Sequence, residues 1–255
     1  MRERSAGTVK TPQEIAIMKQ GGSILRTVMD QLIPLVRPGI STQELDEEAE
    51  RLIRSQGALS SFKEVEKYRW TTCLPIDEQV VHTPPSDRIL KKGELLTIDI
   101  GVYYKSYHTD YATTVCVGGS ADEDKMKFLR TGAKALEVAI AQAQAGNRIG
   151  HISRAIENAV LAGGYFVIRE LTGHAIGRNL HEDPLIPGYL DGRVEDTPSL
   201  TPGMTIAIEV IYSMGSKHVK SEKGNKWSLV TTDGSLSACF EKTVAISKDR
   251  AFVLT

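Results

Sequence analysis

The sequence predicts an α+β fold built from two similar halves, and three observations support this prediction. Residues 11–36 and 41–57 have the apolar spacing of two consecutive amphipathic helices, and a second such pair occupies 126–146 and 152–164. Segments rich in β-forming residues follow each pair of helices. Aspartate or glutamate stands at matching places within those segments. Because only two units are present, we expect a pseudo-twofold domain and not a longer repeat array.

The ends of the first two helices carry recognisable signals. The run Thr11–Glu14 is typical of an N-cap followed by a first helical turn, and Pro34 should kink or end that helix near its last turn. Ser41 and Glu44 have the spacing of a capping box at the start of the second helix, which Gly57 should end.

The β-rich segments of the two halves also resemble each other. The segment that ends at Asp99 can be laid on the segment that ends at Glu209, so that a leucine, a glycine and the carboxylate coincide. The segments that begin at Asp110 and Glu241 are similar as well. Chance similarity between ordinary amphipathic elements would explain the helices alone. The matching carboxylates favour a duplication.

Length and composition exclude several classes of protein. The 255 residues suit one domain, 1–255, with halves of about 11–118 and 121–255. A hydrophobic content of 41% excludes a disordered chain, and a net charge of −1 leaves no electrostatic footprint for nucleic acid. No apolar run approaches the roughly 20 residues that span a bilayer, and the N-terminus lacks the apolar core of a secretory signal. Three scattered cysteines are too few for a disulfide framework and favour a reducing, cytoplasmic compartment.

Four carboxylates occupy places where a purely structural protein rarely has them. Asp99 and Glu209 are flanked by apolar residues within expected strands. A buried lone carboxylate is costly or has a raised pKa, so such groups need a shared cationic partner. Asp99 and Asp110 flank an expected β-hairpin, and a loop of even length would place both on one face, opposite or diagonal. Divalent metal between them would offset their repulsion. In the alternative interpretation, Asp110 only caps the hairpin.

Three of the six histidines have a suggestive setting. His174 and His181 share a glycine-containing segment, and His82 follows an apolar run. The others are expected to be surface or structural groups: His108, His151 and His218. Carboxylate oxygens with one imidazole and no thiolate suit Mn, Fe, Co or Zn in a catalytic site. Two metals about 3.5–4 Å apart, bridged by carboxylates, would form a hydrolytic centre.

These residues resemble a known family. The methionine aminopeptidases have five metal ligands, which the following residues resemble in order and setting: Asp99, Asp110, His174, Glu209 and Glu241. Residues 172–184 are similar to the family signature around its metal histidine, and residues 235–245 to its last-ligand strand. The resemblance runs from about Thr11 to Thr255. It implies the pita-bread fold of the creatinase and aminopeptidase type, with two halves around a curved antiparallel sheet, and the short N-terminus resembles the compact bacterial type I form.

The resemblance also implies a mechanism. Two divalent ions would be held by the five ligands, with Asp110 and Glu241 bridging them, and would activate a water that attacks the scissile carbonyl. Glu209 would act as the general base. His181 would hydrogen-bond the oxyanion, and His82 would contact the scissile amide nitrogen or its neighbour. Simple loop packing is the alternative for both histidines.

The methionine side chain would bind in an apolar pocket. Three residues match the pocket residues of the family, although each could be ordinary core: Tyr68, Cys73 and Trp227. Three positions depart from the family pattern. Thr83 and Ala175 each stand where glycine is usual, and Leu180 stands where many members have an aromatic residue. These departures leave the ligands unchanged and concern pocket shape and substrate range.

The resemblance implies removal of N-terminal methionine from peptides and nascent chains, with a preference for a small second residue. We also expect a cytoplasmic monomer with no DNA or membrane partner. The sequence leaves open whether the ribosome recruits the enzyme. One alternative is a proline-specific (Xaa-Pro) peptidase of the same fold, although such enzymes usually carry a large additional N-terminal domain. A second alternative is a non-catalytic binding protein of that fold, although such relatives typically lose ligands.

Overall fold

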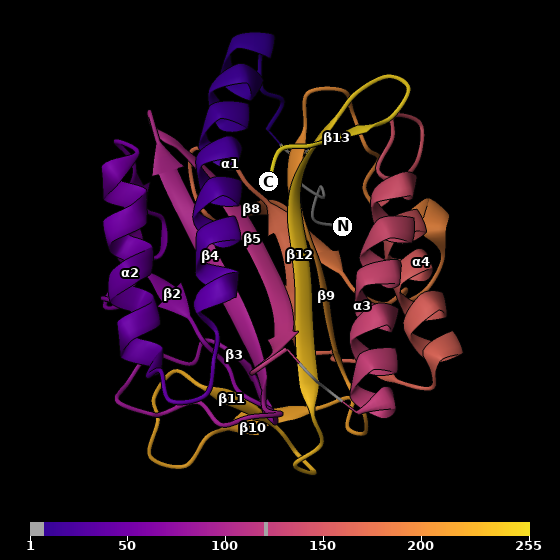
Figure 1. The fold of residues 1–255 in the computed structure, drawn as a ribbon. Helices are drawn as coiled ribbons and strands as arrows, with labels where there is room; N and C mark the ends of the chain where they lie inside the picture. The colour runs from indigo at the N-terminus through magenta and orange to yellow at the C-terminus, as the bar shows by residue number, and fades with distance from the viewer. Residues whose placement is uncertain (1–7, 120–121) are drawn as a thin grey trace.

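The structure is a computed structural model that describes residues 8–119 and 122–255. The expected boundary of the second half at residue 121 therefore lies outside the described residues. Figure 1 shows the α1–α2 pair and the α3–α4 pair on opposite sides of the molecule, with the long strands β4, β5, β12 and β9 between them. No helix within the described ranges is both long and apolar enough to cross a membrane.

The elements follow one another in the expected order of helices and strands. The first half contains α1 (Pro12–Leu32), α2 (Thr42–Ser55), β1 (Leu59–Ser60), β2 (Thr72–Cys73), β3 (Gln79–Val81), β4 (Leu95–Tyr104) and β5 (Tyr107–Cys116). The second half contains α3 (Glu123–Gln142), α4 (Ile149–Gly163), β6 (Phe166–Val167), β7 (Thr172–Ala175), β8 (Glu182–Pro187), β9 (Thr205–Ser213), β10 (Val219–Ser221), β11 (Leu229–Thr231), β12 (Ser237–Ile246) and β13 (Ala251–Val253). Short 3-10 turns occupy Ile33–Leu35, Phe62–Glu64 and Val194–Asp196.

The helix-end signals act as predicted. Thr11 accepts a hydrogen bond from the Glu14 backbone N–H at 3.3 Å, and the Glu14 carboxylate accepts one from the Thr11 N–H at 2.8 Å. Ser41 and Glu44 form the same reciprocal pair at the start of α2. Helix α1 changes to a 3-10 turn directly before Pro34, because proline cannot continue the α-helical hydrogen-bond ladder.

The β4–β5 hairpin places two carboxylates on one face of the first sheet. Its two-residue turn, Lys105–Ser106, has positive φ angles of 47° and 70° at its two positions, the backbone that matches the twist of the flanking strands. Asp99 pairs with Ala112, and Asp110 pairs with Gly101, two residues further along β4. The two carboxylates are therefore diagonal neighbours, as predicted. The alternative interpretation of Asp110 as a hairpin cap is wrong, because it lies inside β5 and is buried.

The second sheet aligns its candidate ligands through strand register. β12 pairs with β9 so that Glu241 lies directly opposite Glu209. β7 pairs with the other edge of β9 and places His174 opposite Ala207, two residues from Glu209 on the same face. This approach requires Gly173, because a Cβ there would lie 2.4 Å from the Ala207 carbonyl oxygen.

The two halves meet where β5 and β12 run side by side. The Thr114 hydroxyl accepts from the Cys239 N–H at 2.9 Å and donates to the Cys239 carbonyl at 3.0 Å. The Thr243 hydroxyl makes the same two bonds with the backbone of Asp110, at 2.8 and 2.9 Å. β3 also crosses the seam and pairs with β11. The expected curved antiparallel sheet is therefore built from separate hydrogen-bonded sheets, which reciprocal threonine bonds join at the seam.

Candidate metal centre

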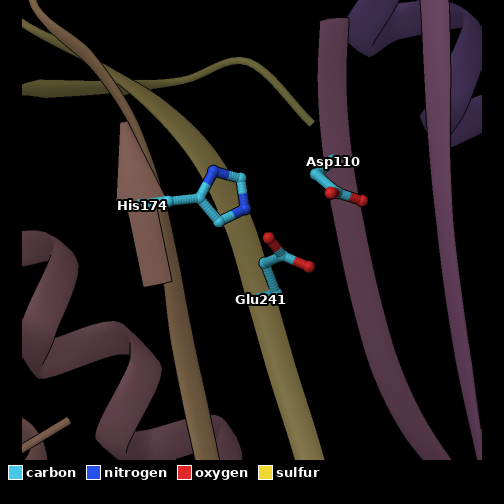
Figure 2. A group of neighbouring side chains, drawn as sticks. All are labelled: Asp110, His174 and Glu241. Atoms are coloured by element: carbon cyan, nitrogen blue, oxygen red, sulfur yellow. The ribbon is translucent and has the colours of Figure 1, made fainter. Parts of the chain in front are cut away.

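Three buried side chains from three strands converge at the seam. Asp110 in β5, His174 in β7 and Glu241 in β12 offer ligand atoms that all lie within 4.8 Å of one another. Figure 2 shows Glu241 between the other two side chains. The residues are 4%, 3% and 2% exposed, respectively, so water screens their charges very little.

The other two predicted ligands line the same pocket. Glu209 Oε1 lies 3.6 Å from His174 Nε2. Asp99 lies two residues along β4 from Gly101, which is the residue directly opposite Asp110. The His174 Nδ1–H donates to the Ala175 carbonyl at 3.0 Å, which leaves Nε2 directed toward the carboxylates. Burial and then the neighbouring His181 lower the pKa of His174 to about 4. Its imidazole is therefore neutral near pH 7, as a metal ligand must be.

The four carboxyl groups would repel one another if all were ionised, and each has a raised pKa. Burial, followed by the neighbouring carboxylates, raises the pKa of Asp99, Glu209 and Glu241 well above the usual range. Burial also raises the pKa of Asp110 to about 7.

The donor set fits a divalent metal. In the part of the chain that the structure describes, no lysine or arginine forms an ion pair with any of the four carboxylates, and Glu241 Oε1 is buried without a hydrogen-bond partner. A cation at this place would satisfy the orphaned oxygen and offset the repulsion among the carboxylates. Several carboxylates with one neutral imidazole suit Mn, Fe, Co or Zn.

One pocket of about 180 Å³ brings together all ten residues singled out in the sequence. They are Tyr68, Cys73, His82, Asp99, Asp110, His174, His181, Glu209, Trp227 and Glu241. The His174 and His181 rings lie 4.5 Å apart between centroids. On the apolar side, the Tyr68 hydroxyl lies 3.1 Å from Cys73 Sγ, and the Tyr68 and Trp227 rings meet edge to face at 5.1 Å.

Sequence reasoning missed three apolar residues of this pocket. Phe62, Val65 and Val81 line it together with Leu180. Phe62 and Val65 belong to a 3-10 turn and its C-cap, where no helical or strand periodicity marks them. Their signal is apolar character in an otherwise charged segment that leads to Tyr68.

The remaining histidines and the departure at Thr83 have structural explanations. His108 is buried, and its Nδ1 lies 2.9 Å from the Ser61 hydroxyl. His151 accepts from the Arg148 N–H in a helix cap, and His218 pairs with a glutamate. The Thr83 hydroxyl lies 2.7 Å from the Ser228 hydroxyl, next to Trp227, so the hydroxyl absent from glycine joins two pocket segments.

Comparison with known proteins agrees with this geometry. Residues 16–248 match the model of metallopeptidase family M24. Methionine aminopeptidase 1 of Bacillus subtilis (strain 168) is 42% identical over 246 residues, which cover 96% of this chain and 98% of that protein. The chain belongs to family M24, among the methionine aminopeptidases. Membership in M24 identifies it as a metallopeptidase, so the buried carboxylate–histidine cluster is the expected kind of site.

Solved M24 structures share the pita-bread fold. The crystal structure of methionine aminopeptidase from Thermotoga maritima superposes with a TM-score of 0.93 at 34% identity, covering 98% of this chain and 99% of that one. The prolidase from Pyrococcus furiosus superposes with a TM-score of 0.77 at 24% identity, and the match covers 97% of this chain but 65% of the prolidase. The prolidase likeness therefore concerns the fold alone.

Proposed function

We propose that this M24 peptidase hydrolyses the peptide bond after an N-terminal methionine, with a preference for a small second residue. The observation that carries the proposal is the single pocket in which a carboxylate–histidine cluster adjoins an apolar wall of Tyr68, Cys73 and Trp227. The 42% identity to methionine aminopeptidase 1 of Bacillus subtilis over nearly the whole of both chains supports it.

The metal would be held by the five side chains of the cluster: Asp99, Asp110, His174, Glu209 and Glu241. We propose two divalent ions, drawn from Mn, Fe, Co and Zn, because four carboxylates carry more negative charge than one divalent ion cancels. When bound, such ions supply Lewis acidity, which polarises a carbonyl and eases the loss of a proton from water.

Three side chains would act on the reacting groups. The Glu209 carboxylate would accept a proton from the attacking water, and its position beside His174 supports that role. His181 lies next to His174 and would donate a hydrogen bond to the oxyanion of the tetrahedral intermediate. His82 also lines the pocket and would contact the scissile amide nitrogen or its neighbour.

The methionine side chain would occupy the apolar wall. Tyr68, Cys73 and Trp227 supply aromatic and sulfur surface there, and Phe62 and Val65 extend it. A thioether packs well against aromatic rings, which favours methionine. The small volume of the pocket, about 180 Å³, favours a side chain over a longer peptide segment.

We further propose that both halves, about 11–118 and 121–255, form one catalytic domain, since both contribute ligands to the pocket. The substrates would be N-terminal methionine peptides and nascent chains at the ribosome. The enzyme would act as a monomer in the cytoplasm, without a DNA or membrane partner.

One assay distinguishes this function from an Xaa-Pro peptidase and from a non-catalytic binding protein. Release of the first residue is measured for Met-Ala, Met-Arg and Ala-Pro peptides, with EDTA and after addition of Mn, Fe, Co or Zn. We expect metal-dependent release of methionine, faster from Met-Ala than from Met-Arg. Preferential hydrolysis of Ala-Pro would favour the proline-specific alternative. Inactivity with every peptide and metal would favour the binding protein.

A further inference from the structure

Asp46 is a buried carboxylate of α2 that lies outside the metal pocket. It is 8% exposed, and its Oδ1 accepts three hydrogen bonds from one segment of chain. The Thr71 and Thr72 N–H groups donate at 2.9 and 2.8 Å, and the Thr72 hydroxyl donates at 2.8 Å. Asp46 forms no ion pair with any residue that the structure describes. Its contacts are therefore directed at two adjacent residues, through both backbone N–H groups and one side-chain hydroxyl.

Such a carboxylate is costly to bury. Burial raises the pKa of Asp46, although the three hydrogen bonds oppose the rise. Lys63, a nearby cation, is held in an ion pair with Glu50, one turn further along α2. Hydrogen bonds to an ionised acceptor are shorter and stronger than neutral ones, so an aspartate at this place fixes the backbone of Thr71 and Thr72 more firmly than an uncharged side chain would.

The segment that Asp46 fixes leads directly into the apolar wall of the pocket. The Thr72 carbonyl accepts a hydrogen bond from the Tyr68 hydroxyl at 2.8 Å. The next residue, Cys73, pairs with Asp99 across the β2–β4 ladder. Thr72 thus touches Asp46 through its N–H and hydroxyl and Tyr68 through its carbonyl. One residue, Thr72, therefore separates Asp46 from the apolar wall, and two residues, Thr72 and Cys73, separate it from the candidate ligand Asp99.

We propose that Asp46 is a positioning residue for side-chain specificity, which holds Tyr68 and Cys73 in place through Thr72. The inference rests on the proposed function, because it concerns selection of the methionine side chain. Asp46 itself touches neither the pocket nor the cluster of ligands. Its loss lets the apolar wall shift, which weakens selection among side chains while the metal-bound reaction centre stays intact.

Intrinsic tryptophan fluorescence can report movement of the apolar wall. The chain contains two tryptophans, Trp70 and Trp227, and both rings pack edge to face on Tyr68, at 5.2 and 5.1 Å. Intrinsic tryptophan emission therefore reports on the surroundings of Tyr68 even in the absence of substrate.

The test compares Asp46→Ala, Asp46→Asn and Thr72→Val with the control Glu48→Gln in the metal-loaded, full-length protein. Glu48 is an acid of the same helix whose carboxylate pairs with Arg51 on the surface. The readouts are kcat and KM for Met-Ala-Ser and Leu-Ala-Ser and the tryptophan emission spectrum. The ratio of kcat/KM between the two peptides is independent of the fraction of folded enzyme, so a merely structural role does not change it.

We expect Asp46→Ala to lower the methionine-to-leucine ratio by about tenfold, mainly through KM for the methionine peptide, and to change the tryptophan emission. Asp46→Asn and Thr72→Val should lower the ratio less, since each keeps part of the hydrogen-bond set, and Glu48→Gln should match the wild type. If Asp46→Ala does not fold, the methionine-to-leucine ratios and emission spectra of Asp46→Asn and Thr72→Val test the proposal. An unchanged ratio and unchanged emission in the Asp46 variants and in Thr72→Val would overturn the proposal. Failure of the wild type to release methionine would contradict the proposed function instead, and the emission spectra would still test the positioning role.

Discussion

The position of Glu241 is unfavourable for the stability of the metal-free protein but suitable for a metal ligand. Its carboxylate is buried, and one oxygen has no hydrogen-bond partner. Burial, followed by the neighbouring carboxylates, raises its pKa. An amide of the same shape would remove charge repulsion from the folded metal-free state, yet it would bind a divalent cation much more weakly. The proposed role as a metal ligand would explain the carboxylate, whereas the stability of the fold does not.

We predict opposite effects of Glu241→Gln on activity and on stability. Metal-dependent release of methionine should fall by roughly 10³-fold or more, because a ligand charge is lost. The midpoint of unfolding of the EDTA-treated protein should rise, because one of four repelling carboxylates is gone. Peptide assays and thermal unfolding in EDTA measure the two effects. Glu195→Gln, an exposed acid in a 3-10 turn, is the control. Full activity of Glu241→Gln would remove Glu241 from the site.

His181→Ala tests the oxyanion role. The ring lies beside His174, at 4.5 Å between centroids, but His181 is not one of the three residues whose ligand atoms converge within 4.8 Å. We predict that kcat falls by roughly 10²–10³-fold while metal affinity, measured by titration calorimetry, stays unchanged. An unchanged kcat would exclude His181 from the mechanism, and a lost metal affinity would make it a ligand.

At the scale of elements, the seam between β5 and β12 depends on two threonine hydroxyls. Each hydroxyl pairs with both the N–H and the carbonyl of one residue on the opposite strand, Thr114 with Cys239 and Thr243 with Asp110. In a continuous sheet, the backbone of a neighbouring strand would normally form hydrogen bonds with these N–H and carbonyl groups. The bond from Thr243 also ties the backbone of a candidate ligand to the other half of the molecule.

Thr114→Val should therefore destabilise the protein by about 1–3 kcal/mol, because it leaves buried backbone groups of Cys239 unpaired while the side-chain shape is preserved. Urea unfolding measures the change. Thr113→Val is the matched control, since Thr113 is the adjacent β5 residue and points to the opposite face of the strand. Equal stability of the two variants would show that the hydroxyl does not stabilise the seam.

Local signals predicted most elements, because their causes lie within a few residues. The N-cap at Thr11, the helix end before Pro34 and the placement of Asp99 and Asp110 on one face of a hairpin all follow from short-range geometry. Phe62 and Val65 were not predicted, because their place in the pocket does not depend on nearby residues in the chain. A 3-10 turn of three residues has no periodicity, and only packing onto the far strands makes these residues part of a pocket.

At the scale of the whole molecule, the clustered carboxylates, as the proposed ligands, would couple metal binding to pH. In the metal-free protein, the pKa of Asp110 is raised from 3.8 to about 7, so the folded state holds a proton that the unfolded state has already lost. The corresponding stability is fully present below pH 3.8 and is lost as pH rises through about 7. The other three carboxyls shift in the same direction. If these carboxyl groups hold metal as proposed, they must lose their protons when it binds.

We therefore predict that stabilisation by metal grows as pH rises toward and through about 7. Thermal unfolding with saturating metal and with EDTA, at matched pH values between about 5.5 and 8, measures the difference. His174 should contribute little to the trend, because its lowered pKa of about 4 keeps it neutral across this range. A difference that is flat with pH would contradict the assignment of the buried carboxylates as ligands.

Residue chemistry and local periodicity were enough to predict the two-halved α+β fold, the helix ends and four unusual carboxylates, because each of these depends on neighbours in the chain or on the properties of a side chain. The five candidate ligands in order came from the resemblance to the methionine aminopeptidases. The tertiary structure decided which of them share one pocket. It also revealed Asp46, whose partner Thr72 lies 26 positions away, and Thr114, whose partner Cys239 lies 125 positions away. Such contacts depend on how strands and helices pack over the whole molecule, and no local pattern encodes them.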